Sequence, residues 1–111
     1  MGDETQVIEL GERVAQIARE LNIETIVIGA YAMAIHNYVR GSLDFDLGTR
    51  IELDELYRLR RAIDATGLST RLNSPDEFDD LGGKLIIWNR VDEDGDPLEP
   101  VEVVNFFNPL H

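Results

Sequence analysis

Apolar residues recur at helical spacing in two stretches of the chain. The first stretch predicts an amphipathic helix over residues 7–21, which Asn22 ends because Asn tolerates the left-handed conformation. Asp3 is placed to cap the start of this helix, with Gln three residues later as in a capping box. The second stretch predicts a helix over residues 52–65, followed by Gly67 as its C-terminal glycine.

Strand patterns separate these helices. A short β-branched run at residues 25–28 predicts a buried strand, and alternation over residues 42–47 predicts another. Residues 84–91 and 101–107 predict a β-hairpin, joined by a polar connection with an Asp-Gly turn. The remaining expected elements are a helix over 30–38, a strand over 68–72, a turn or strand end over 48–51 and a helical turn from Ser74. This order predicts one mixed α/β or α+β domain over residues 1–111.

Composition excludes several classes of function. The formal net charge is −12, from 22 acidic and 10 basic residues, so the surface repels nucleic acid backbones and anionic membranes. The absence of cysteine excludes disulfides, thiolate metal sites and cysteine nucleophiles. The start of the chain is acidic, and no apolar run approaches the roughly 20 residues of a membrane span. We expect a cytoplasmic protein.

An Asp-x-Asp pair is the strongest candidate for chemistry. On a strand, Asp44 and Asp46 point to one side, about 6.5–7 Å apart, while Leu43, Phe45 and Leu47 point into the core. A hard divalent cation would relieve the repulsion between the two carboxylates, and oxygen ligands suit Mg²⁺ or Mn²⁺. The alternative is that the pair is the solvated face of an amphipathic strand.

Gly29 marks a second candidate feature. A strand that ends in glycine and leads into a helix presents backbone N–H groups to a phosphate, and glycine allows the ligand to approach closely. The alternative is an ordinary strand-to-helix turn.

Taken together, these features resemble the nucleotidyltransferase (polymerase-β-like) superfamily, especially the AbiEii-type toxins and the minimal nucleotidyltransferases. The matching residues are Gly29, Ala30, Arg40, Ser42, Asp44 and Asp46. The match is close over residues 28–47 and loose over residues 24–107. It implies a nucleotidyltransferase-like fold, with a central mixed β-sheet flanked by helices.

The resemblance also implies a set of three metal-binding acids. Asp44 and Asp46 would hold the metals, and a later strand would supply the third carboxylate. Glu102 is the candidate because it is the only acid in the apolar stretch 101–107, although it could instead be a surface acid at a strand end. Two Mg²⁺ ions would bridge these acids and a nucleoside triphosphate, and a nucleoside monophosphate would pass to a hydroxyl acceptor.

Nucleotide binding is assigned by the same resemblance to a second group of residues. Gly29 and Ala30 would form the phosphate turn, where Ala30 replaces the usual Gly or Ser. Ser42 belongs to the motif, and Arg40 and Lys84 are the candidate phosphate partners. The alternatives are a surface ion pair for Arg40 and an ordinary edge position for Lys84.

The expected function is therefore a metal-dependent nucleotidyltransferase, with a toxin–antitoxin or defence module as its setting. Active relatives usually carry an additional helical region for the acceptor, which a partner protein or a homodimer would supply here. The alternatives are a catalytically inactive nucleotide- or partner-binding member of the fold, or an acidic interaction domain without a ligand.

Overall fold

The computed structural model describes residues 2–29, 45–75 and 81–108. Over these residues the chain is an α+β domain built on a mixed five-stranded sheet, which confirms the predicted class. The strands, in spatial order, are β1 (Ile26–Gly29), β2 (Phe45–Thr49), β7 (Val101–Asn105), β4 (Lys84–Trp88) and β3 (Ser69–Asn73). Only β2 and β7 run parallel, and the other neighbouring strands are antiparallel. β7 is the central strand.

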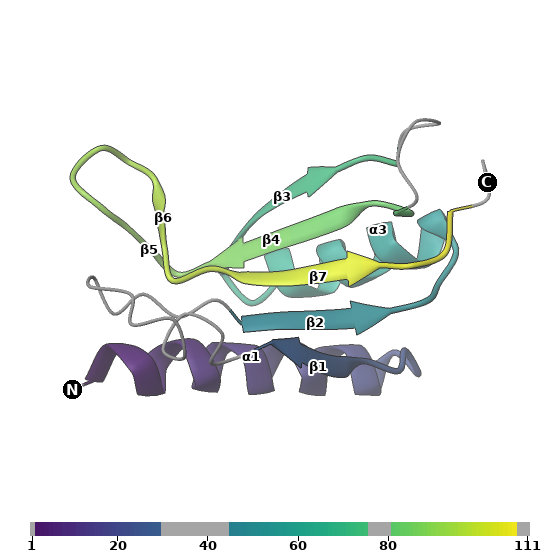
Figure 1. The fold of residues 1–111 in the computed structure, drawn as a ribbon, viewed down its shortest axis with the longest axis horizontal. Coiled ribbons are helices and arrows are strands. Elements are labelled where there is room, and N and C mark those ends of the chain that lie inside the picture. The colour runs from purple at the N-terminus through teal and green to yellow at the C-terminus, as the bar shows by residue number, and fades with distance from the viewer. Residues whose placement is uncertain (1, 30–44, 76–80, 109–111) are drawn as a thin grey trace.

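Two helices cover one face of this sheet. α1 (Gly2–Glu20) lies along the half of the sheet that contains β1 and β2, and α3 (Leu53–Asp64) lies behind the other half (Figure 1). Their apolar residues and the inward residues of the strands form one core: Val7, Val14, Ala18, Ile23, Phe45, Leu47, Leu56, Leu59, Ile63, Leu68, Leu85, Ile87, Val101 and Val103. Neither of these two helices covers the opposite face, which we call the open face.

The ends of the helices follow local rules. Asn22 adopts φ 63° directly after α1, and Gly67 adopts φ 92° after α3, as the sequence predicts. The capping prediction at Asp3 is wrong, because α1 begins at Gly2 and already contains Asp3.

The predicted hairpin is present, but its first strand is interrupted. β4 pairs antiparallel with β7, whereas Arg90–Val91 forms β5, which pairs with β6 (Pro97–Leu98) in a separate ribbon. This ribbon extends beyond one end of the main sheet (Figure 1). The Asp-Gly turn joins β5 to β6, and Gly95 there has φ 86°.

Of the two alternatives predicted for residues 48–51, the structure shows the strand end. β2 continues to Thr49, because Gly48 and Thr49 pair with β7 and the Thr49 hydroxyl donates a hydrogen bond to the Glu24 carbonyl at 2.8 Å. The predicted helix over 30–38 and the start of the strand at 42–44 lie outside the described residues, as do residues 76–80.

The strand at residues 25–28 is present but not buried. β1 occupies an edge of the sheet, and its side chains Ile26, Val27 and Ile28 are 67%, 60% and 47% exposed. The prediction of a buried strand is therefore wrong.

A buried amide closes one end of the sheet. The Asn105 side chain is fully buried at the end of β7. Its Oδ1 accepts hydrogen bonds from the N–H groups of Ile51 and Phe107, at 3.0 and 3.2 Å. Its Nδ2 donates to the carbonyls of Ile51 and Gly82, at 2.9 and 3.0 Å. Asn105 thereby ties three separate segments of the chain together.

Candidate functional site

The register of the parallel strands places two predicted acids side by side. Asp46 in β2 and Glu102 in β7 are direct partners, so their Cα atoms lie on neighbouring strands about 4.8 Å apart. Both belong to the open face, because their neighbours Phe45, Leu47 and Val101 point into the core on the other side. Both side chains are half-buried. Glu102 therefore lies on the face that a shared metal site with Asp46 requires.

Lys84 joins this pair from the third strand. Its Nζ lies 3.0 Å from Glu102 Oε1, and the two side chains are 36% and 26% exposed. Lys84 is the register partner of Val104, so it reaches Glu102 diagonally across the β4–β7 ladder. The open face thus carries two carboxylates and one ammonium group on three consecutive strands.

Gly29 ends β1 beside the same cluster. It pairs with Asp46 after an irregularity in the β1–β2 register. Glycine has no side chain that would keep a ligand away from the backbone. Gly29, Asp46 and Glu102 consequently form a row across three neighbouring strands, with Lys84 next to it. We call these four residues the open-face cluster.

The other predicted site residues are not placed. Ala30, Arg40, Ser42 and Asp44 lie outside the described residues. The structure therefore brings together four of the eight predicted positions and leaves the metal and nucleotide roles as predictions.

Arg71 is a basic residue near the cluster that the sequence analysis missed. It pairs with Ile86, which in turn pairs with Glu102, so it lies two strands from that acid on the same face. The alternation of polar and less exposed residues along β3 could have indicated it, because Ser69, Arg71 and Asn73 alternate with residues that turn toward α3. Together with Lys84, Arg71 adds positive charge to this face.

A second group of acids lies on the β5–β6 ribbon. One carboxylate oxygen from each of Asp92, Asp94 and Asp96 lies within 4.8 Å of the others, so the group could hold a metal ion. Asp92 Oδ1 also accepts the N–H groups of Asp94 and Asp96, at 2.8 and 2.9 Å. This carboxylate therefore already has a structural role, since it closes the turn.

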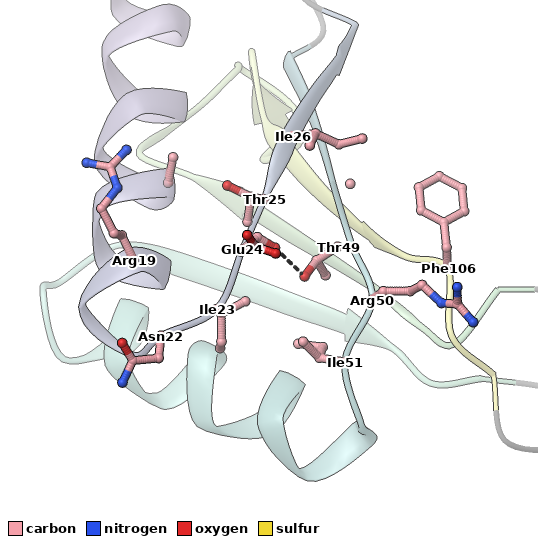
Figure 2. Close-up of a pocket in the computed structure, with 12 residues that line it drawn as sticks. Arg19, Asn22, Ile23, Glu24, Thr25, Ile26, Thr49, Arg50, Ile51 and Phe106 are labelled. Atoms are coloured by element: carbon pink, nitrogen blue, oxygen red, sulfur yellow. Dashed lines mark hydrogen bonds between the residues drawn. The ribbon is translucent and has the colours of Figure 1, made fainter.

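A hollow of about 770 Å³ has no residue of the open-face cluster in its lining. Figure 2 shows the residues that line it. It is lined by the last turns of α1, the start of β1, the end of β2 and Phe106. Arg19 and Arg50 lie on opposite sides of it and extend away from each other (Figure 2). Neither Asp46 nor Glu102 lines the hollow. Its size alone does not make it the site of chemistry, because its charged groups do not converge.

Comparisons with protein-family models, curated proteins and solved structures found no match. Within the part of the chain that the structure describes, no helix has the length and apolar character needed to cross a membrane.

Proposed function

We propose that the open-face cluster binds a nucleoside triphosphate together with Mg²⁺ and transfers a nucleoside monophosphate to a hydroxyl acceptor. The acceptor oxygen would bond to the α-phosphorus, the bond to the β-phosphate would break so that pyrophosphate leaves, and the hydroxyl proton would pass to water. One observation carries the proposal: Asp46 and Glu102 are in register on adjacent parallel strands, with Gly29 beside them. Two carboxylates on one face are a donor set that fits Mg²⁺ or Mn²⁺. In this proposal Asp44 completes the set.

Each residue has a distinct task in this reaction. Asp46 and Glu102 would hold the metal, which when bound neutralises phosphate charge and lowers the pKa of the acceptor hydroxyl. Gly29 leaves room for the triphosphate beside the backbone. Lys84 would exchange its contact with Glu102 for one with a phosphate oxygen, which an ammonium group on a flexible stem can do.

The same ion pair favours a second candidate function. Lys84 Nζ already neutralises Glu102 at 3.0 Å, as a bound cation would. A site whose carboxylate is already neutralised by a lysine would suit a catalytically inactive protein of the nucleotidyltransferase-like fold, which binds a nucleotide or a partner protein without metal. The two candidates differ in whether binding depends on a divalent cation.

Isothermal titration with Mg²⁺, Mn²⁺ and each nucleoside triphosphate tests the first proposal. We expect triphosphate binding that requires the cation and weakens at least about tenfold in Asp46→Asn and in Glu102→Gln. Asp54→Asn is the matched control, because Asp54 is an exposed acid on α3, on the other side of the sheet. Binding should be unchanged in this control.

The ribbon acids require a separate control. All titrations are repeated in an Asp94→Asn/Asp96→Asn background, which removes the second possible metal site. Metal-dependent binding that disappears in this background would contradict the proposal, and so would wild type that binds no triphosphate with metal.

Transfer itself is measured with a triphosphate labelled at its α-phosphate. Label that moves to protein or RNA hydroxyls in wild type, and not in Asp46→Asn, supports a nucleotidyltransferase. Cation-independent binding without transfer supports the inactive alternative. The proposed setting is a cytoplasmic toxin–antitoxin or defence module, in which a second chain supplies the acceptor surface.

A further inference from the structure

The edge strand β1 exposes apolar side chains on both of its faces. Ile26, Val27 and Ile28 follow one another along the strand and are 67%, 60% and 47% exposed. Successive residues of a strand point to opposite faces, so neither face of β1 is covered. No strand in the described part of the chain pairs with its outer edge.

Phe106 enlarges this apolar surface. It is 49% exposed. A Cβ atom built at Gly48 would lie 2.9 Å from both Ile28 Cδ1 and Phe106 Cε2, so these two side chains meet above Gly48. Ile26 points to the same side as Phe106 (Figure 2). We call Ile26, Val27, Ile28 and Phe106 the β1 patch.

The opposite edge of the sheet is built differently. The side chains exposed on β3 are polar, namely Ser69, Arg71 and Asn73. Charged or polar side chains on an edge strand discourage pairing with another chain. β1 has no charged residue and no proline, so one edge of this sheet is protected and the other is not.

We propose that β1 pairs with β1 of a second copy of this chain, antiparallel about a two-fold axis near Val27. This register sets Ile26 opposite Ile28 of the partner subunit, so apolar side chains meet on the open face, and it aligns the two Val27 residues. A two-fold axis that joins two sheet edges in this way is perpendicular to the sheet. Both open faces then lie on one side of a single continuous sheet.

The size of the patch fits a second copy that binds weakly. The exposed fractions of its four side chains add up to on the order of 350 Å² of apolar surface per chain. A standard interface buries about 800 Å² per partner, so this one lies at the small end of the range, where association is weak and transient. The two paired β1 strands carry no charged residue, and the net charge of −12 comes from other parts of each chain. The two subunits therefore repel at long range, and salt should strengthen the dimer by screening.

Sedimentation velocity without metal or nucleotide tests this pairing independently of the proposed catalysis. Wild type at about 5 to 500 μM should shift from monomer to dimer, with tighter association at about 500 mM NaCl than at 50 mM. Val27→Lys should remain monomeric throughout, because a charge at the seam opposes strand pairing. Val91→Lys is the matched control, since Val91 is 50% exposed on β5 and lies outside the patch. It should dimerise like wild type.

A second measurement covers the case in which Val27→Lys does not fold. Amide hydrogen exchange of wild type should show protection at residues 26–28 that rises with protein concentration, because pairing buries the outer edge of β1. Wild type that stays monomeric over the whole range would overturn the proposal. So would a folded Val27→Lys that dimerises as well as Val91→Lys, or protection at β1 that does not change with concentration.

Discussion

Replacing Asn105 by alanine should destabilise this protein more than almost any other single polar change. Asn105 is fully buried, and its amide makes four hydrogen bonds at 2.9–3.2 Å to the backbone of three segments. Alanine removes all four bonds at once and provides no replacement. The partner groups at Ile51, Gly82 and Phe107 then lack this contact.

The magnitude follows from the number and the burial of these bonds. A hydrogen bond between neutral groups contributes about 1 kcal/mol net to stability, so the loss of four would lower the free energy of unfolding by about 4 kcal/mol at most. Three of the bonds are only partly buried, so water can replace part of what is lost, whereas the bond to the Gly82 carbonyl is buried. We therefore expect a loss of about 3 kcal/mol in the free energy of unfolding, and a fall in Tm of about 10–15 °C.

Urea unfolding provides the measurement. The chain has a single tryptophan, Trp88 in β4, whose fluorescence reports on the sheet, and circular dichroism reports on the helices. A small domain has about 5–15 kcal/mol of stability, so Asn105→Ala should still fold and give a complete transition. The two signals should change together if unfolding is two-state.

Asn89→Ala is the matched control, because Asn89 is exposed between β4 and β5. It should change the free energy of unfolding by less than about 0.5 kcal/mol. A loss of less than about 1 kcal/mol in Asn105→Ala, close to that of the control, would show that the amide does not hold these segments together.

Three further predictions concern the core, the cluster and the ribbon. Gly11→Ala should lower the free energy of unfolding by about 1–2 kcal/mol, measured by thermal melts, because the added Cβ would collide with the buried ring of Phe45. This overpacking outweighs the gain of roughly 1 kcal/mol in helix propensity, and a higher Tm would contradict the prediction. Lys84→Met should raise the affinity for Mg²⁺ about tenfold in calorimetry, since it removes a positive charge beside Glu102. Unchanged affinity would show that the metal does not bind beside Glu102. Asp92→Ala should open the turn between β5 and β6, so that amide exchange at residues 94–96 becomes faster. The urea midpoint of the whole domain should change by less than about 0.3 M. Unchanged slow exchange at residues 94–96 would show that the turn does not need this carboxylate.

The sequence predicted the elements whose signals are local. Both described helices and the turn glycine at Gly67 follow from spacing within a few residues of the chain, and the structure contains them. The edge position of β1 could not be predicted in this way. A run such as Ile26–Val27–Ile28 has the same composition in a central strand and in an edge strand, and only long-range pairing decides between them.

In the candidate site, too, the features with a local signal were predictable and those that depend on long-range pairing were not. The alternation around Asp46 predicted its face correctly, because Phe45 and Leu47 are buried. Its partnership with Glu102, 56 residues further along the chain, depends on the parallel register of β2 and β7 and has no local signal. The ion pair between Glu102 and Lys84 depends on another long-range register, the antiparallel pairing of β4 and β7, so the sequence predicted both residues but not their contact.

The position of β7 has a consequence for how the chain can reach its fold. β7 is the central strand of the sheet and follows every other strand in the sequence. While the chain is being synthesised, β2 and β4 have no strand between them, and their pairing edges stay open until residues 101–105 are made. Such late, long-range closure slows folding. A chain cut before Val101 would therefore lose the central strand of its main sheet, and the pairs β1–β2 and β4–β3 would have no strand to join them.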